Sequence, residues 1–560
     1  MSAVPLSYFV NLSSSLTFFN VYGCMSQGEL PPNIFSLPNL LDLNLDYNDF
    51  TVSFPKSNWS NNCTLIGSIP SSLVNLTKLT TLDLSRNELT GHIPSFVVKL
   101  EQLMYVDLSL NNFTGVLDLG VFSTLKNLQG PLPIPPLPIV YFWATDNHFS
   151  GEIPTSICKV SSLESLGLAR NNLSSSIPQC LGNLTNLWDL DLSANKFEGT
   201  LLRSLDSPLP IPPPTTRFFL SANNKIGGKV SPLICNATEL KVLDLSNNSL
   251  MGTLLECLMS FSKNLSVLNL RMNMIHGMIP RTFAEDNKLR TIDLSRNRFE
   301  GTLPRSLLHC EKLEVLDLGN NRMKDTFPDW LGTLPKLQVL VLRSNMFHGF
   351  MSSPREARSF FELHIFDLSN NNLSGPLPVS YIMKLIAMMY QDKRQGKPQY
   401  MGDGNYQDSV MVTMKGLEIR LVKIVIVFTS IDLLSNHFGG ELPVYIGNLK
   451  SLKGLNFSHN NLTGYIPLST GNLTELEWLD LSLNKFIGSI PQELADLTHG
   501  GWFEWRAILM GYGCGTVGGV SLGYIVLGSR KFEWLAGLLE RKGANMRKKW
   551  RRNARRSYQI

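Results

Sequence analysis

The sequence is poor in the residues from which catalytic and metal sites are built. Its 560 residues include only eight cysteines and nine histidines, with no C-x-x-C pair and no zinc-ligand spacing. Neither a dense disulfide framework nor a structural zinc site is indicated. No catalytic or nucleotide-binding motif falls between a strand and a helix, since G-Y-G-C-G at 511–515 lies in an apolar run. We therefore expect no enzymatic activity, no cofactor and no metal.

A strong net charge is also missing, because the formal charge is only +5. Residues 530–560 hold eleven Lys and Arg against Glu533 and Glu540, so the rest of the chain is slightly acidic. No basic stripe interleaved with aromatic residues occurs outside this segment. The composition therefore argues against a nucleic-acid partner.

A motif of about two dozen residues recurs along most of the chain. A clear copy is LTKLTTLDLSRNELTGHIP, from Leu76 to Pro94. Leu82 and Leu84 alternate with polar residues, which predicts a short strand with one buried side. One such strand cannot bury its leucines, whereas stacked copies form a sheet over a continuous core. The pattern is that of a leucine-rich repeat and predicts an α/β-type solenoid with a parallel concave sheet.

Each repeat places an asparagine where the chain turns away from the strand. Its amide both donates and accepts hydrogen bonds, so a column of such asparagines is expected to satisfy backbone groups buried in the turns. Cys24 takes the position in a degenerate first copy, and a copy near Ser221–Ile226 is one residue out of step. Together the copies predict about seventeen turns. The other positions are Asn48, Asn87, Asn111, Asn147, Asn171, Asn195, Asn248, Asn273, Asn297, Asn321, Asn345, Asn371, Asn436, Asn460 and Asn484.

A block of about three repeats is duplicated in tandem. The run P-L-P-I-P-P occurs at 131–136 and again at 208–213, an offset of 77 residues. Two pairs of cysteines share this offset, and the members of each pair lie one repeat apart. In an oxidising compartment each pair is a candidate disulfide, with buried thiols as the alternative. The pairs are Cys158 with Cys180, and Cys235 with Cys257.

The repeat stops between Val379 and Val427. This insert begins apolar, becomes polar and glycine-containing, and then alternates over Ser409–Lys415 like a strand. An insert of this length in a compact array is usually functional or disordered. We favour a functional insert, with a surface loop that only covers its neighbours as the alternative. The candidate residues are Tyr406, Lys415 and Gly416.

Residues 507–529 contain no charged residue and are flanked by Arg506 and Arg530. As a helix they are about 35 Å long, enough to cross a bilayer core of about 30 Å. The basic residues that follow place the C-terminus in the cytoplasm and the array outside. Glycines four residues apart predict a face that pairs with another membrane helix. They are Gly511, Gly515, Gly519 and Gly523.

Fourteen N-x-S/T sequons agree with passage through the secretory pathway. Residues 1–19 show no signal peptide, so we expect the chain to begin inside the array. The sequons start at Asn11, Asn58, Asn62, Asn75, Asn112, Asn172, Asn183, Asn236, Asn247, Asn264, Asn372, Asn456, Asn461 and Asn472.

Large or cationic residues at strand positions predicted to face solvent are candidates for ligand contact on the concave face. They are Trp188, Arg271, Arg296, Arg343 and Trp478. The aspartates of the recurring L-D-L-S, such as Asp83 and Asp293, are interpreted as solvated repeat positions and not as a metal site.

These motifs together resemble the plant leucine-rich-repeat receptor-like proteins, in particular the kinase-less disease-resistance type. The resemblance rests on the L-x-G-x-I-P repeat, on Y-Q-D-S-V-M-V-T-M-K-G-L-E (Tyr406–Glu418) leading into V-F-T-S-I-D, and on the G-Y-G-C-G membrane segment. It implies that the insert is an island domain which, with the last repeats, serves ligand and co-receptor binding. It also implies that the glycine-rich helix pairs with an adaptor receptor kinase. The cysteine-bearing N-terminal cap and the C-terminal cap of that family are missing here.

The sequence therefore predicts a single-pass plasma-membrane receptor of plant defence signalling, glycosylated, that binds an extracellular peptide, protein or glycan. An extracellular enzyme-inhibitor-like binding protein, an inert scaffold or decoy, and a non-functional truncated paralogue are the alternatives. The predicted segments are a degenerate first repeat 1–36, repeats 37–378, island 379–427, repeats 428–498, juxtamembrane residues 499–506, the transmembrane helix 507–529 and a basic tail 530–560.

Overall fold

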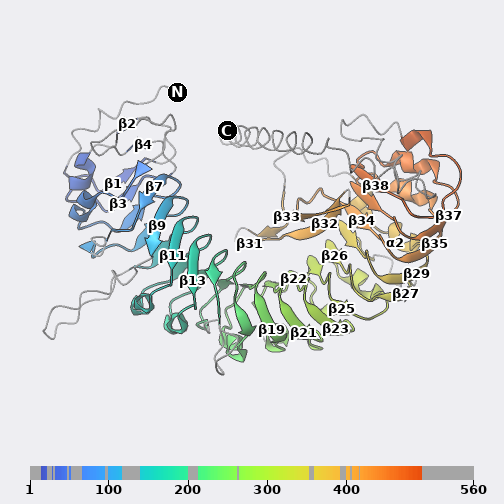
Figure 1. Cartoon of the computed structure of the whole chain (residues 1–560), viewed down its shortest axis with the longest axis horizontal. Coiled ribbons are helices and arrows are strands. Elements are labelled where there is room, and N and C mark those ends of the chain that lie inside the picture. Colours follow the sequence, from blue (N-terminus) through green and yellow to red (C-terminus); the bar gives the residue numbers. More distant parts are fainter. Residues whose placement is uncertain are drawn as a thin grey trace, which may run out of the picture.

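The computed structural model describes most of the repeat array, and it forms a curved solenoid (Figure 1). The described residues are 14–21, 28–29, 32–46, 50–51, 66–94, 99–116, 139–199, 212–260, 264–351, 359–390, 399–403, 406–414 and 416–494.

One parallel sheet lines the inner, concave side of the solenoid. In the described residues it has 17 strands, in agreement with the number of turns expected from the repeat. Each strand pairs with that of the next repeat, and its middle residue, such as Leu82 or Leu268, packs into one continuous core, buried in every strand but β38. The strands are β1 Phe18–Asn20, β3 Asp42–Asn44, β6 Thr81–Asp83, β8 Tyr105–Asp107, β10 Tyr141–Trp143, β12 Ser165–Gly167, β14 Asp189–Asp191, β16 Phe218–Leu220, β18 Val242–Asp244, β20 Val267–Asn269, β22 Thr291–Asp293, β24 Val315–Asp317, β26 Val339–Val341, β28 Ile365–Asp367, β34 Ser430–Asp432, β36 Gly454–Asn456 and β38 Trp478–Asp480.

A second set of short parallel strands is formed by the residues that follow the asparagine of each repeat. They are β2 Gly28–Glu29, β4 Phe50–Thr51, β5 Ile66–Gly67, β7 Glu88–Gly91, β9 Asn112–Val116, β11 His148–Gly151, β13 Asn172–Ser175, β15 Lys196–Phe197, β17 Gly227–Lys229, β19 Ser249–Thr253, β21 Met274–Gly277, β23 Arg298–Gly301, β25 Arg322–Met323, β27 His348–Phe350, β29 Asn372–Pro376, β35 His437–Glu441 and β37 Asn461–Thr463.

Short 3₁₀ helices occupy the convex side in many repeats (Figure 1), and most of them bury an apolar residue, such as Leu73 or Ile157. They are η2 Pro32–Ser36, η3 Ser71–Asn75, η6 Thr155–Lys159, η7 Gln179–Asn183, η8 Pro232–Asn236, η9 Arg305–His309, η10 Asp329–Thr333, η11 Val444–Asn448, η12 Leu468–Asn472 and η13 Gln492–Leu494. The α-helices of the described residues are short: α1 Cys257–Ser260, α2 Val379–Ile382 and α3 Ile386–Met389.

The asparagine column forms as the sequence predicted. The Asn297 amide donates to the carbonyl oxygens of Leu270, Leu294 and Ser295 at 2.8, 3.1 and 3.2 Å. Its own oxygen accepts from the backbone N–H of Ile275 in the preceding repeat, at 3.1 Å. Each asparagine therefore joins its own turn to the preceding repeat. The out-of-step copy uses Asn224 in the same way.

The residue before each asparagine adopts a left-handed backbone conformation, which the sequence analysis did not predict. Arg86, Met272 and Arg296, for example, have φ of 53°, 53° and 55°. This conformation costs about 1–2 kcal/mol for a residue with a side chain. The four hydrogen bonds of the neighbouring asparagine offset that cost, so residues other than glycine are tolerated there.

The insert leaves and re-enters the solenoid between two hydrogen-bonded strands, because β28 pairs directly with β34. Its first residues, in α2 and α3, pack into the main core through Tyr381, Leu385 and Met388. The insert then forms two antiparallel hairpins, β30 Gly402–Asp403 with β31 Tyr406–Gln407, and β32 Val410–Met414 with β33 Leu417–Leu421. We call residues 399–426 of this segment, as far as they are described, the island.

Some predicted features lie outside the described residues. Within the described ranges, no helix is long and apolar enough to span a bilayer. The apolar segment 507–529, its four spaced glycines and the basic tail fall beyond those ranges. The other features outside them are Cys24, Asn48, the proline run 131–136, Lys415, and the sequons at Asn11, Asn58 and Asn62.

Candidate functional site

The aspartates at the third position of the concave strands were expected to be solvated. This expectation is wrong for four buried ones, Asp83, Asp293, Asp317 and Asp367, while Asp107, Asp191, Asp244 and Asp480 are partly exposed. Asp293 is buried, and its Oδ1 accepts hydrogen bonds from the backbone N–H and the hydroxyl of Ser295, at 3.0 and 2.6 Å. Asp83 with Ser85 and Asp367 with Ser369 repeat this arrangement. These carboxylates therefore close the turns after β6, β22 and β28.

Burial changes the acidity of these groups. It raises the pKa of Asp83 to about 6, and burial together with the nearby Asp317 carboxylate raises the pKa of Asp293 to about 8. In both groups burial disfavours the charged form, because a carboxylate loses hydration when it is buried.

The island lies across the concave face over strands β18 to β28 (Figure 1). Asp408 is its anchor: its side chain is fully buried and accepts hydrogen bonds from Arg290 and from the Thr291 hydroxyl, the latter at 2.7 Å. The Tyr406 hydroxyl donates to Asp244 Oδ2 and accepts from the Asn269 amide, both at 2.9 Å. Tyr406, predicted as a site residue, therefore fastens the island to the sheet.

An apolar contact completes this docking. Val410 and Val412 of the hairpin and Ile424 beyond it pack against the valines of β24 and β26 and against Ile365 of β28. Gly416 turns the hairpin with a φ of 74°, a conformation that favours glycine. The island is therefore folded and packed on the concave face, an arrangement that both the functional insert and the covering loop predict.

Arg343 was predicted to face solvent, and this is wrong, because only 3% of its surface is exposed. Its guanidinium lies 3.2 Å from Glu418 and 3.8 Å from Asp367. Glu418 also pairs with Arg296, which is more exposed. Both arginines therefore neutralise the negative charge of Glu418 in the island hairpin.

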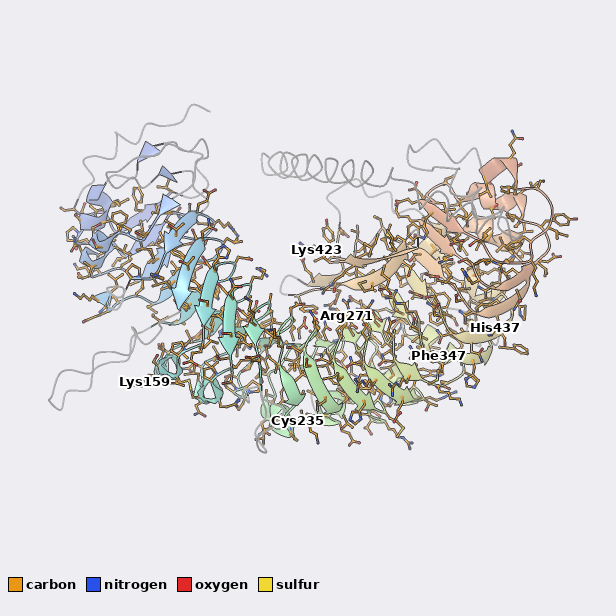
Figure 2. The ribbon with its side chains drawn as sticks, viewed as in Figure 1. Lys159, Cys235, Arg271, Phe347, Lys423 and His437 are labelled. Carbon is orange, nitrogen blue, oxygen red and sulfur yellow. A yellow bond between two sulfur atoms is a disulfide. The ribbon has the colours of Figure 1, made fainter. Side chains whose placement is uncertain are left out.

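Arg271 is buried too, with 6% of its surface exposed, again contrary to the prediction (Figure 2). Desolvation is the largest cause of its lowered pKa, although Asp293 and Asp317 act in the opposite direction. No carboxylate of the described residues lies within ion-pair distance of it.

The two predicted tryptophans differ in exposure. Trp478 is only 6% exposed and stacks on Phe428, with ring centroids 5.8 Å apart, so its predicted exposure is wrong. Trp188 is half-buried at the open part of the concave face. Its ring meets Phe218 edge-on at 6.1 Å.

That open part, over strands β8 to β16, carries a group of aromatic rings that we call the aromatic platform. It consists of Tyr105, Tyr141, Trp143, Trp188 and Phe218. The Tyr105 ring lies 5.4 Å from that of Trp143 and 6.1 Å from that of Tyr141, measured between centroids. All five rings are half-buried. The described contacts of the island fall on β18 and later strands, so they leave this surface uncovered.

Hydrogen bonds fix the polar edges of these rings. The Trp143 indole N–H donates to Ser165 Oγ at 2.8 Å, and Ser165 in turn donates to Asp189. One oxygen of Glu164 accepts from the Tyr141 hydroxyl and from the Trp188 indole, at 3.2 and 3.3 Å.

Gly167 leaves room for the Trp143 ring because it has no side chain. A Cβ atom at this position would lie 2.7 Å from Trp143 Cδ1, which is too close. The platform is thus built from residues of several repeats. Only Trp188 was selected from the sequence; Tyr105, Tyr141 and Trp143 were missed, although the strand register alone places them on the concave side.

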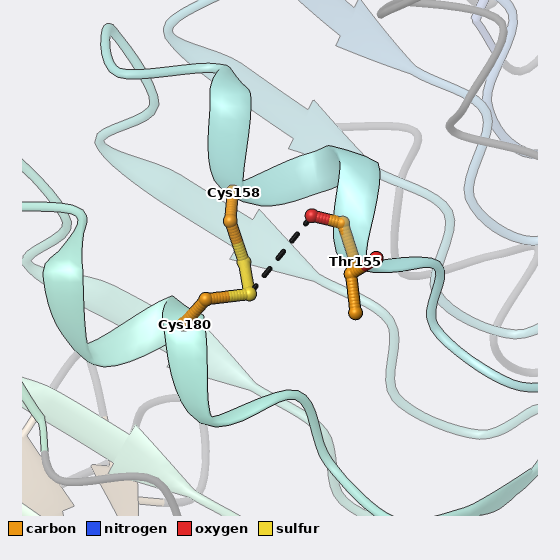
Figure 3. The surroundings of a disulfide bond; sticks show 3 residues. All are labelled: Thr155, Cys158 and Cys180. Carbon is orange, nitrogen blue, oxygen red and sulfur yellow. Dashed lines mark hydrogen bonds between the residues drawn. A yellow bond between two sulfur atoms is a disulfide. The ribbon is translucent and has the colours of Figure 1, made fainter.

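Two disulfides tie neighbouring repeats on the convex side. Cys158 is bonded to Cys180 with Cα atoms 5.7 Å apart, and Cys235 to Cys257 with Cα atoms 5.8 Å apart. Figure 3 shows the first, with Cys180 Sγ 3.9 Å from the Thr155 carbonyl oxygen.

Most described sequons are at least partly exposed, but Asn456 is an exception. It is 6% exposed and its side chain accepts from Ser458, so we remove it from the candidate glycosylation sites.

Fold and site together define a leucine-rich-repeat solenoid with a partly covered concave face. Family models described as leucine rich repeat match residues 287–347 and residues 78–100, 162–184, 239–261, 362–381, 451–473 and 475–497.

The predicted resemblance to plant receptor-like proteins is confirmed. The chain is 36% identical to Receptor-like protein 32 of Arabidopsis thaliana over 306 residues, which are 54% of this chain and 34% of that protein. It is 36% identical to Receptor-like protein 33 of the same plant over 338 residues, 60% of this chain and 38% of that protein. These matches thus span little more than a third of their relatives.

Solved structures of plant receptors are similar as well. The plant peptide hormone receptor RGFR1, in complex with RGF2, matches 87% of this chain and 70% of its own with a TM-score of 0.65 and 26% identity. The Arabidopsis receptor kinase HAESA, in complex with the peptide hormone IDA and the co-receptor SERK1, matches 88% of this chain and 74% of its own with a TM-score of 0.66 and 25% identity.

Proposed function

We propose that this chain is the recognition part of a plant cell-surface receptor that binds an extracellular ligand on its concave face. The observation that carries the proposal is the island, because it covers one part of that face and leaves the aromatic platform open beside it. The likeness to RGFR1 and HAESA, both seen with peptide hormones, favours a peptide or protein ligand over a glycan.

Signalling is proposed to pass through partner kinases in plant defence. An adaptor receptor kinase would pair with the glycine face of residues 507–529, and a co-receptor kinase would contact the island and the last repeats. HAESA is seen with its co-receptor SERK1, which supports the second contact by analogy. The proposed topology is a single-pass plasma-membrane protein with the array outside.

The first test is the glycosidase sensitivity of the C-terminally tagged chain expressed in plant cells. A mobility shift on deglycosylation is expected, because exposed sequons such as Asn75 and Asn461 would be glycosylated in the lumen. An unshifted chain would contradict the cell-surface proposal.

The second test is co-purification of receptor kinases with the tagged chain. Replacing all four spaced glycines by leucine should abolish recovery of the kinase, because close approach of two helices needs small residues. The replaced residues are Gly511, Gly515, Gly519 and Gly523. The control is Gly513→Leu, which would fall on the other side of the expected helix. Equal loss in both variants would refute the pairing face.

A further inference from the structure

The aromatic platform differs from the part of the concave face under the island, because it has no described contact with the island and carboxylates lie among its rings. Glu164 and Ser165 accept hydrogen bonds from the edges of its rings, and Gly167 leaves room for the Trp143 ring. A surface whose side chains are already fixed loses little conformational entropy when a ligand binds. The platform is therefore preorganised for a ligand.

The charge of this surface is not neutralised by the described part of the chain. Glu164, Asp107, Asp189 and Asp191 lie among the rings, and no described Lys or Arg lies within ion-pair distance of them. Two nearby arginines already pair with other carboxylates, Arg86 with Asp46 and Arg170 with Asp146. A ligand that carries positive charge would supply the missing partner.

The chemistry left available at the platform also points to a cation. The Tyr141 hydroxyl and the indole N–H groups of Trp143 and Trp188 already bond within the protein, so they are not offered to the hydroxyl groups of a sugar. What remains are ring faces, carboxylate oxygens and the Tyr105 hydroxyl. Ring faces attract ammonium and guanidinium groups, and carboxylates accept their hydrogen bonds.

We propose that the aromatic platform is a binding subsite for an extended basic peptide segment, whose lysine or arginine side chains lie between the rings and the carboxylates of strands β8 to β16. This inference rests on the proposed receptor function and specifies its ligand. Five neighbouring strands about 4.8 Å apart span roughly 19 Å. An extended peptide at about 3.3 Å per residue covers this distance with about six residues.

Burial raises the pKa of Asp107, Asp189 and Asp191, so each of these carboxylates is harder to ionise in the free protein. A bound cation would favour the charged carboxylates and so oppose the shift.

The test uses the purified full chain and three probes: a seven-residue peptide of alternating glycine and lysine, the same peptide with glutamine for lysine, and the neutral sugar chitohexaose. Isothermal titration should show the lysine peptide binding about tenfold or more tighter than the glutamine peptide. Preference for chitohexaose would overturn the basic-peptide assignment but leave the receptor proposal standing, since glycosidase sensitivity and kinase recovery report on that separately.

Variants separate the platform from diffuse attraction to an acidic surface. Trp143→Leu and Glu164→Gln should each weaken the lysine peptide about tenfold, whereas Trp330→Leu on the convex helix η10 should not. If Trp143→Leu affects folding, Gly167→Ala tests the same ring, because the added Cβ atom would displace the Trp143 side chain. Wild-type affinity in a folded Trp143→Leu or Gly167→Ala variant would refute the proposal.

Discussion

Removal of the Asp408 carboxylate should release the island without unfolding the solenoid. The Asp408 side chain has no exposed surface and holds Arg290 and Thr291. Truncating one member of a buried pair costs about 3–5 kcal/mol. Arg290 keeps Glu314 at 3.3 Å, so we take the lower end, about 3 kcal/mol, for Asp408→Ala. That corresponds to an increase of about 150-fold in the undocked island.

Hydrogen exchange is the suitable assay, because it measures local opening. Amides of β32 and β33 should exchange about 100-fold faster in Asp408→Ala, while those of β22 and β24 should not change. Glu418→Gln is the matched control. Glu418 is half-exposed, and exposed ion pairs contribute only about 0–1 kcal/mol, so its effect should stay below about sixfold. Equal acceleration in both variants, or faster exchange in β22 and β24, would refute the reasoning.

Three further predictions concern stability. Asn297→Ala should lower the free energy of unfolding by about 1–3 kcal/mol in urea titrations, since buried backbone groups lose their partners, whereas the exposed Asn186→Ala should change it by about 0.5 kcal/mol or less. The Asp293 pKa of about 8 exceeds its unfolded value of about 3.9, so this carboxyl contributes stability that is full below about pH 4 and is lost as pH rises through 8. The melting temperature should therefore fall from pH 6 to pH 9, and a slope as steep in Asp293→Asn would contradict this. A non-reduced digest should link Cys158 to Cys180 and Cys235 to Cys257, and free thiols at all four positions would contradict this. Reduction should lower the melting temperature, because each bond closes a loop between residues 22 apart and is worth about 3 kcal/mol.

The periodic part of the structure was predictable because each repeat makes the same contacts. Asparagine spacing alone led to the hydrogen bonds of Asn297, and the strand register follows from Leu82 and its counterparts. The cysteine offset led to the two pairs that are bonded.

The candidate site was less predictable, because the island obeys no period. Nothing in the repeat spacing of Arg343 indicates that Thr413 and Glu418, seventy or more residues later, contact it. The aspartates were misjudged for a related reason: a polar strand position looks solvated until the turn that it closes is known. The platform, by contrast, was readable from the register of Tyr105, Tyr141 and Trp143.

The direct pairing of β28 with β34 has an evolutionary consequence. Since the two strands are neighbours whether or not anything is inserted between them, the curvature of the array does not depend on the length of the insert. The island can therefore be exchanged, lengthened or lost by recombination as a cassette, while the surface beside it is inherited unchanged. Recognition by the two parts of the concave face is free to diversify at different rates.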